Sequence, residues 1–240
     1  DDLVASPTTA GAAAETVVAR LTQTGRFENL RMVGLQLDQW EGALLAHAKA
    51  MTYWHRRHRF CGDCGSPTRS AWAGHLRVCT NPACGQQQFP RTDPAIIVRT
   101  TLNETRCLLG RQPTWRPTQY SNVAGFVEPA ESLEAAVVRE VREETGVQLR
   151  TVRYHSSQPW PFPSSLMVGF TAEAASEAIH LNDGELEDAR WFTREEIRAG
   201  LLAHTLRLPS PVSISYRLIE DWFDMASPGA LRRILAQLEE

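Results

Sequence analysis

The segment from Gly125 to Val147 constrains this chain most strongly, because it predicts a helix that carries carboxylates on its apolar side. We expect the helix to run from about Leu133 to Thr145. Ser132 precedes it as a plausible N-cap, and Gly146 follows it where a left-handed residue often ends a helix. An amphipathic helix of this kind needs a core against which to pack.

At about 100° per residue, the glutamates of this helix fall on the side that faces the core. The apolar stripe consists of Leu133, Ala136, Val137 and Val141. Glu140 and Glu144 lie within that stripe, and Glu143 lies at its edge. Carboxylates that face a core are costly unless they are paired or bind a metal, and Mg²⁺ or Mn²⁺ prefers such hard oxygen ligands. The alternative is a solvated acidic face, with salt bridges to Arg139 and Arg142.

Four of the five cysteines form two closely spaced pairs, Cys61 with Cys64 and Cys79 with Cys84. A glycine follows each pair, which suits two tight turns that aim four thiolates at one tetrahedral zinc ion. Disulfides are the alternative, although pairs this close in sequence chelate more often. Because cysteine occupies all four positions, no position remains for water, and the zinc is predicted to be structural. Cys107 is predicted to be a core residue.

Two further segments have both a structural and a functional interpretation. The helix expected over 40–59 ends in His55, Arg56, Arg57, His58 and Arg59. These cations either suit a helix C-terminus or form a patch that attracts phosphates or RNA. The prolines between Ser157 and Ser165 predict a rigid loop. Its aromatic residues, Trp160 and Phe162, either fill a gap in the core or stack on a planar base.

The rest of the chain mixes strands and helices without regular alternation, which favours an α+β layered sandwich. We expect a hairpin over 95–112, strands over 120–127 and 185–192, and helices near the C-terminus. The predicted domains are an N-terminal domain over 1–58, a zinc ribbon over 59–89 and a catalytic domain over 90–240. The net charge of −3 gives no global basic field, and no apolar run approaches membrane-spanning length. We expect no membrane partner and a cytoplasmic location.

Gly125, Glu131 and the run 139–147 match the Nudix box, GX5EX7REUXEEXGU, at every fixed position. The chain therefore resembles a Nudix hydrolase. The run SQPWPFPSS beyond the box, the four-cysteine ribbon and the FPRTDPAII segment are similar to the NADH pyrophosphatase (NudC-type) subfamily. The resemblance implies a Nudix-type α/β/α sandwich with a mixed sheet. It also implies hydrolysis of NADH or NAD⁺ to nicotinamide mononucleotide and AMP, removal of NAD caps from RNA, and a homodimer with shared active sites.

The resemblance also implies roles for single residues. Catalytic Mg²⁺ or Mn²⁺ would be bound by Glu140, Glu144 and Glu185, with the Ala124 carbonyl and with Glu143 as a second-rank ligand. Glu144 would also orient or deprotonate the attacking water. Arg139 is expected to hold a box glutamate rather than to touch substrate. The expected substrate contacts are Arg31, Phe89, Gln158, Pro159, Trp160, Pro161, Phe162, Pro163, Ser164, Ser165 and Ser215.

Two other functions remain open at this point. The first is a Nudix hydrolase of another dinucleotide, such as ADP-ribose, although the complete SQPWPFPSS run argues against it. The second is a zinc-ribbon module that binds NAD or RNA without cleaving it. Such a module would be expected to lose carboxylates of the box, whereas Glu131, Glu140, Glu143 and Glu144 are all present.

Overall fold

The structure is a computed structural model that describes residues 11–182 and 184–238. The chain divides into two compact units, Asp1–Gly42 and Ala43–Glu240. The first unit contains helices α1 (Gly11–Thr24) and α2 (Leu30–Val33). The division into 1–58, 59–89 and 90–240 stays a prediction. Among the described helices, none is both long enough and apolar enough to cross a lipid bilayer.

Helix α3 (Gln39–Arg57) leads into a small antiparallel sheet, where the predicted ribbon lies. This sheet has the order β1–β2–β3, with β1 (Thr68–Ala71), β2 (Leu76–Cys79) and β3 (Gln87–Gln88). A short 3-10 turn, η1 (Trp72–Gly74), joins the first two strands. The ribbon is therefore built mainly from turns, and it needs a further constraint to hold it together.

The large sheet has six strands in the order β7–β8–β4–β5–β9, and β6 also pairs with β4. β4 and β8 run parallel, whereas the other pairs are antiparallel, so the sheet is mixed. Its strands are β4 (Asp93–Leu102), β5 (Arg106–Arg111), β6 (Val123–Phe126), β7 (Leu149–Trp160), β8 (Ser165–Ala174) and β9 (Asp188–Thr193).

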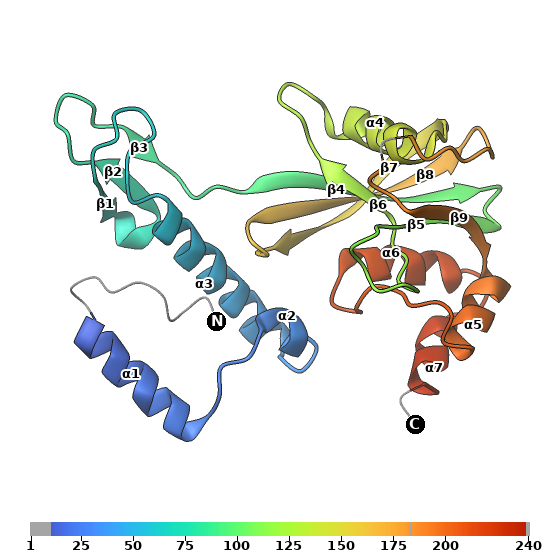
Figure 1. The fold of residues 1–240 in the computed structure, drawn as a ribbon, viewed down its shortest axis with the longest axis horizontal. Helices are drawn as coiled ribbons and strands as arrows, with labels where there is room; N and C mark the ends of the chain where they lie inside the picture. Colours follow the sequence, from blue (N-terminus) through green and yellow to red (C-terminus); the bar gives the residue numbers. More distant parts are fainter. Residues whose placement is uncertain (1–10, 183, 239–240) are drawn as a thin grey trace. The chain divides into compact units, whose positions relative to one another are not determined.

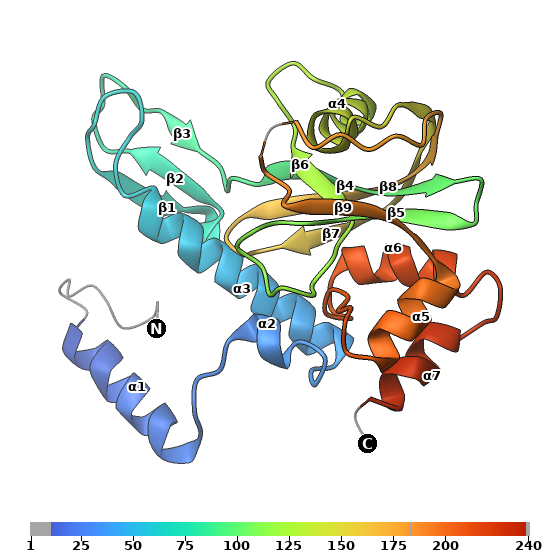
Figure 2. The ribbon, with the colours of Figure 1, turned by 45° about the vertical axis from the view of Figure 1, so that its right-hand side comes forward.

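Helices cover both faces of this sheet (Figures 1 and 2). On one face lies α4 (Leu133–Thr145), and on the other lie α5 (Arg194–Leu202), α6 (Ile214–Phe223) and α7 (Ala230–Ala236). Ile96 and Val98 of β4 pack in one core with Val137 of α4, and Ile97 packs in another with Leu218 of α6. A strand buried on both faces reads as a continuous apolar run. This arrangement confirms the predicted α/β/α sandwich with a mixed sheet.

Most of the expected elements are present, with shifted ends. The predicted hairpin is formed by β4 and β5, and Asn103 and Glu104 make its turn with φ values of 51° and 58°. The strand expected over 120–127 is shorter, because only Val123–Phe126 pairs along β4. The strand expected from Glu185 begins at Asp188, so Glu185 lies in the preceding loop.

The loop predicted over 157–165 is mostly strand, which corrects that prediction. β7 continues to Trp160, and Pro159 pairs with Leu166 of β8. The prediction excluded a central strand, but β7 is the edge of the sheet, where a missing N–H breaks no ladder on the outer side. Only residues 161–164 remain as the turn between β7 and β8.

Candidate active site

Helix α4 has the bounds and caps that the sequence predicts. The Ser132 hydroxyl accepts a hydrogen bond from the Ala135 N–H at 3.2 Å, and Gly146 adopts a left-handed φ of 70°. Glu140 and Glu144 are 8% and 3% exposed, so both carboxylates belong to the buried side of the helix. Glu143 is exposed at its edge. The helix therefore brings two charged side chains toward the sheet.

Gly125 lies against the carboxylate of Glu140. A Cβ added to Gly125 would lie 1.9 Å from the Glu140 carboxyl carbon and 1.9 Å from its Oε1. Gly125 belongs to β6, where it pairs with Ile96 of β4. Only glycine leaves space for this approach, which gives the first position of the box a physical reason.

Arg139 binds three glutamates of the box at once. Its Nε and Nη2 donate to the two carboxylate oxygens of Glu131 at 2.8 and 2.9 Å. Its Nη1 donates to Glu140 Oε1 at 2.8 Å and to Glu143 Oε2 at 3.0 Å. Nη2 also donates to the Phe126 carbonyl oxygen at 2.9 Å. The helix thus carries its own partial compensation, and the expectation that Arg139 holds a box glutamate is confirmed.

The remaining charge is still unfavourable for Glu140. Burial raises the pKa of Glu140, hydrogen bonding and charge from Arg139 lower it, and the charges of Glu143 and Glu185 raise it again. The net direction is upward. Glu131 differs, because its hydrogen bonds with Arg139 lower its pKa to about 2. The charge of Glu185, in the loop before β9, therefore acts on a carboxylate of the box helix.

The donor set suits a hard divalent cation. The charges of Glu143 and Glu185 both act on Glu140, and Glu144 lies buried on the same side of the helix as Glu140. Ala124 stands next to Gly125 in β6, so its carbonyl belongs to the strand that faces Glu140. Excess negative charge on oxygen ligands is what Mg²⁺ or Mn²⁺ would relieve. Which residues bind metal stays a prediction.

Several predicted substrate residues make contacts within the protein. Gln158 donates from Nε2 to the Val212 carbonyl oxygen at 2.6 Å and accepts at Oε1 from the Ile214 N–H at 2.7 Å. Ser164 donates from its hydroxyl to Asp93 Oδ2 at 2.9 Å. Gln158 and Ser164 therefore fix the two ends of the hairpin tip. Sequence reasoning offers no signal for these partners, because they are distant in the chain.

Ser215 is also engaged. It is 4% exposed, and its hydroxyl lies 2.8 Å from Ser121 Oγ. Asn122 donates from Nδ2 to the Ser215 hydroxyl and carbonyl oxygens at 3.0 and 2.9 Å. A substrate contact by Ser215 stays a prediction, and the structure adds a role for it in joining α6 to the segment before β6.

The aromatic residues of the hairpin contact each other. Trp160 and Phe162 meet edge to face with ring centroids 5.0 Å apart. The Lys49 ammonium lies 5.5 Å from the centre of the Phe162 ring.

The remaining predicted substrate residues differ in their exposure and position. Phe89 is 58% exposed just before β4, and Arg31 belongs to the first unit. Among the other hairpin residues, Pro159 and Pro163 are exposed, Pro161 is buried and Ser165 is half-buried.

The four ribbon cysteines converge as predicted. Their sulfur atoms all lie within 4.8 Å of one another, with Cys61–Cys84 at 3.8 Å and Cys64–Cys79 at 3.4 Å. Four sulfurs at about 2.3 Å from a tetrahedral zinc would be about 3.8 Å apart. Gly65 and Gly85, which follow the two pairs, have φ values of 71° and 60°. Hydrogen bonds from Ser66 lower the pKa of Cys64 to about 6, whereas burial raises the pKa of Cys79 to about 12. Binding of zinc by all four thiolates would therefore release protons.

Both sites lie within segments that match models of known families. A model of the NADH pyrophosphatase zinc ribbon domain matches residues 56–89, and a model of the NUDIX domain matches residues 90–211. The chain is similar to the NAD-capped RNA hydrolase NudC of Mycobacterium bovis, with 44% identity over 203 residues, 81% of this chain and 64% of that protein. It is also similar to a NAD-capped RNA hydrolase of Macaca fascicularis, with 41% identity over 198 residues, 78% of this chain and 43% of that protein.

The chain therefore spans less than two thirds of the length of these relatives. Among solved structures, a NUDIX hydrolase from Nitrosomonas europaea is similar over 58% of this chain and 80% of its own, with 22% identity and a TM-score of 0.49. The four-cysteine cluster agrees with the ribbon match and indicates a structural zinc site. Since the NUDIX match covers just over half of the 240 residues and contains the complete box, this chain belongs to the NUDIX family.

Proposed function

We propose that this protein is a NAD(H) diphosphatase that hydrolyses NADH or NAD⁺ to nicotinamide mononucleotide and AMP. We also propose that it removes NAD caps from RNA and leaves a 5′-monophosphate. The observation that carries the proposal is the group of box carboxylates at Arg139, with Glu140 against Gly125, combined with the complete SQPWPFPSS run on the β7–β8 hairpin. The names of the similar hydrolases support the same substrate class.

In the proposed reaction, water attacks one phosphorus of the diphosphate and the bond from that phosphorus to the bridging oxygen breaks. Bound Mg²⁺ or Mn²⁺ would neutralise the diphosphate and lower the pKa of the attacking water. Glu140, Glu144 and Glu185 would hold the metal, with help from Glu143 and the Ala124 carbonyl. Glu144 would orient the water and accept its proton. Arg139 keeps the neighbouring carboxylates in place and touches no substrate.

The hairpin supplies the proposed nucleotide contact. Trp160 ends β7, the edge strand of the sheet, and Phe162 lies in the turn that follows it. Base stacking on such aromatic rings is worth about 1–3 kcal/mol per base. Phe89, Ser164 and Ser165 would line the same region, and Arg31 is a proposed contact from the first unit. We further propose a homodimer with shared active sites, acting in the cytoplasm, where NAD and RNA both occur.

The test is product analysis by chromatography, with purified protein, Mg²⁺ or Mn²⁺, and three substrates in parallel. NADH should yield nicotinamide mononucleotide and AMP, and a 5′-NAD RNA should yield a 5′-monophosphate RNA. Preferential cleavage of ADP-ribose would favour a different Nudix hydrolase. No product from any substrate, with zinc bound and the protein folded, would favour a non-catalytic binding module.

Light scattering tests the proposed homodimer. A monomer at working concentration would contradict it.

A further inference from the structure

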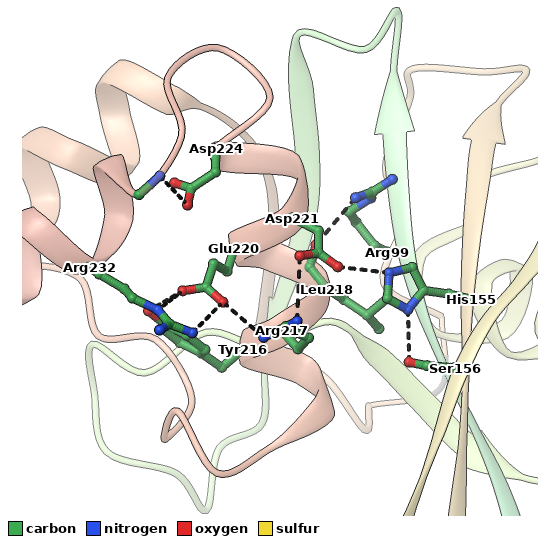
Figure 3. A network of polar contacts seen from close by, with 11 residues as sticks. Arg99, His155, Ser156, Tyr216, Arg217, Leu218, Glu220, Asp221, Asp224 and Arg232 are labelled. Carbon is green, nitrogen blue, oxygen red and sulfur yellow. Dashed lines mark hydrogen bonds and ion pairs between the residues drawn. The ribbon is translucent and has the colours of Figure 1, made fainter.

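His155 of β7 and Asp221 of α6 join the edge strand to the helix beneath the sheet (Figure 3). His155 Nε2 lies 2.8 Å from Asp221 Oδ2, and His155 Nδ1 lies 2.8 Å from Ser156 Oγ. The pairing of β7 with β8 shifts its register between Tyr154 and Ser156, which leaves His155 as the extra residue of a bulge. Bulges redirect side chains, and here the imidazole points toward the helix.

A second charged side chain contacts Asp221, and the helix around Asp221 is bound to β4. Arg217 of the same helix lies 3.6 Å from Asp221 Oδ1. Arg99 of β4 donates to the Leu218 carbonyl oxygen at 3.3 Å. Burial lowers the pKa of Arg99, and the charge of Asp221 opposes that shift. Asp221, whose side chain is 39% exposed, is therefore shared between His155 and Arg217.

Gln158 makes a second attachment between the same strand and the same helix. Its amide binds the Val212 carbonyl oxygen and the Ile214 N–H, at the point where α6 begins. Ile214 also packs against Gly169, where an added Cβ would lie 2.8 Å from Ile214 Cδ1. The segment that leads into the hairpin tip is thus attached to α6 at both His155 and Gln158.

Helix α6 connects this hairpin to the strand of the carboxylate site. Ser215, in its first turn, binds Ser121 and Asn122 through hydrogen bonds of 2.8 to 3.3 Å. Asn122 leads directly into β6, which carries Gly125 against Glu140. A displacement of α6 relative to β7 would therefore change the spacing between the proposed nucleotide contacts and the proposed metal ligands.

We propose that His155 and Asp221 are positioning residues that set the SQPWPFPSS hairpin relative to the carboxylate site. Both lie on the α6 side of the sheet, whereas the box helix lies on the other (Figures 1 and 3). The inference rests on the proposed function, because it assigns the hairpin to nucleotide binding. Loss of the pair should weaken binding of the ground state and the transition state alike, which raises KM and leaves kcat nearly unchanged.

The decisive variant is His155→Ala, because it removes the contact between β7 and Asp221 and keeps Asp221 next to Arg217. We expect the KM for NADH to rise by about tenfold, the scale of one hydrogen bond to a charged group, with kcat within about twofold. His155→Gln retains a donor and should recover most of the lost affinity. Arg150→Ala is the matched control, because it removes a β7–β8 ion pair of 3.1 Å that does not reach α6.

A double variant tests whether the two residues act as a pair. Combining His155→Ala with Asp221→Asn should raise KM no further than the more affected single variant. Zinc content and thermal melting verify that each protein is folded. An unchanged KM in folded His155→Ala, equal losses in the Ala and Gln variants, or a fall confined to kcat would overturn the inference. If the wild type neither binds nor hydrolyses NADH, the proposed function fails and the inference fails with it.

Discussion

The carboxylate of Glu140 lies directly on the backbone of Gly125, with 1.9 Å between its Oε1 and the place of a Cβ. This contact joins the box helix α4 to β6, across the interface where the sheet meets the helix. The contact also makes two positions far apart in the box depend on each other, because a side chain at Gly125 would displace the carboxylate of Glu140.

Gly125→Ala should therefore disturb both stability and activity. The added methyl group forces Glu140 or β6 to shift, and overpacking of this kind costs about 1–3 kcal/mol. Chemical denaturation measures the stability, and hydrolysis of NADH measures the activity. The control is Gly42→Ala, where no atom lies within 4 Å of the added Cβ and a helical alanine should stabilise by about 0.5–1 kcal/mol. Wild-type behaviour of Gly125→Ala would contradict the contact.

Glu144→Gln should keep the protein folded and abolish most of its activity. The amide has the same shape, but it lacks the charge that a divalent cation requires, so we expect kcat to fall by about a hundredfold or more. Glu140→Gln should behave similarly and also keep its stability, because burial already disfavours the charged form of Glu140. Circular dichroism and steady-state kinetics check both variants. Near-wild-type turnover in Glu144→Gln would mean that the proposed ligand set is wrong.

Arg139→Lys tests whether geometry or charge holds the box together. An ammonium cannot bind Glu131 with two parallel hydrogen bonds while also reaching Glu140 and Glu143. We expect the free energy of unfolding to fall by about 1–3 kcal/mol and kcat to fall with it. Arg142→Lys is the matched control, because its exposed side chain should change stability by less than about 0.5 kcal/mol. Equal behaviour of the two variants would refute the role given to Arg139.

The Glu131–Arg139 pair also predicts a dependence of stability on pH. The pKa of Glu131 is lowered from 4.5 to about 2, so the folded state binds fewer protons than the unfolded state. The stabilisation is fully present above pH 4.5 and is lost as the pH falls through 2. The difference in the free energy of unfolding between wild type and Glu131→Gln should therefore become smaller as the pH falls from 4.5 to about 2. Denaturation curves at several pH values measure this difference. If it stays constant as the pH falls, the pKa of Glu131 is not lowered in the folded protein.

Zinc should bind with one ion per chain and hold the ribbon together. Elemental analysis should give a ratio of about one, and chelation should lower the melting temperature, because metal binding is coupled to folding in such modules. Cys64→Ser should lose zinc. Cys107→Ala should retain it, because Cys107 is a residue of β5 and its side chain is buried in the core of the large sheet. Full zinc content in Cys64→Ser would show that the ribbon uses other ligands.

The helix and its carboxylates were predictable because both depend on local sequence. The 3.6-residue period places Glu140 and Glu144 on the buried side, and short-range rules identify Ser132 and Gly146 as caps. The partners of Gln158 and Ser215 were not predictable, because they lie on other elements and their contacts depend on the finished fold. The same holds for Arg139 and the carbonyl of Phe126.

The proline-rich run over 157–165 shows a second limit of predicting structure from local sequence. Local rules exclude proline from the interior of a sheet, but they do not reveal which strand becomes the edge. The order of the strands decides that Pro159 can remain in β7, and this order is a property of the whole sheet. The bulge at His155 has the same origin, since it appears only where β7 pairs with β8.

Arg139 gives the box helix a counter-ion that cannot diffuse away. Its effective concentration at Glu140 is set by the fold and does not vary with the supply of metal in the cell. A divalent cation bound at the proposed site would have to compete with this guanidinium for the same oxygen, so Arg139 would set a threshold concentration for loading. With Arg139 in place, the helix would fold before a metal arrives and would release it without unfolding. Folding and metal exchange would then be separate events at this proposed site, whereas the zinc ribbon would link them.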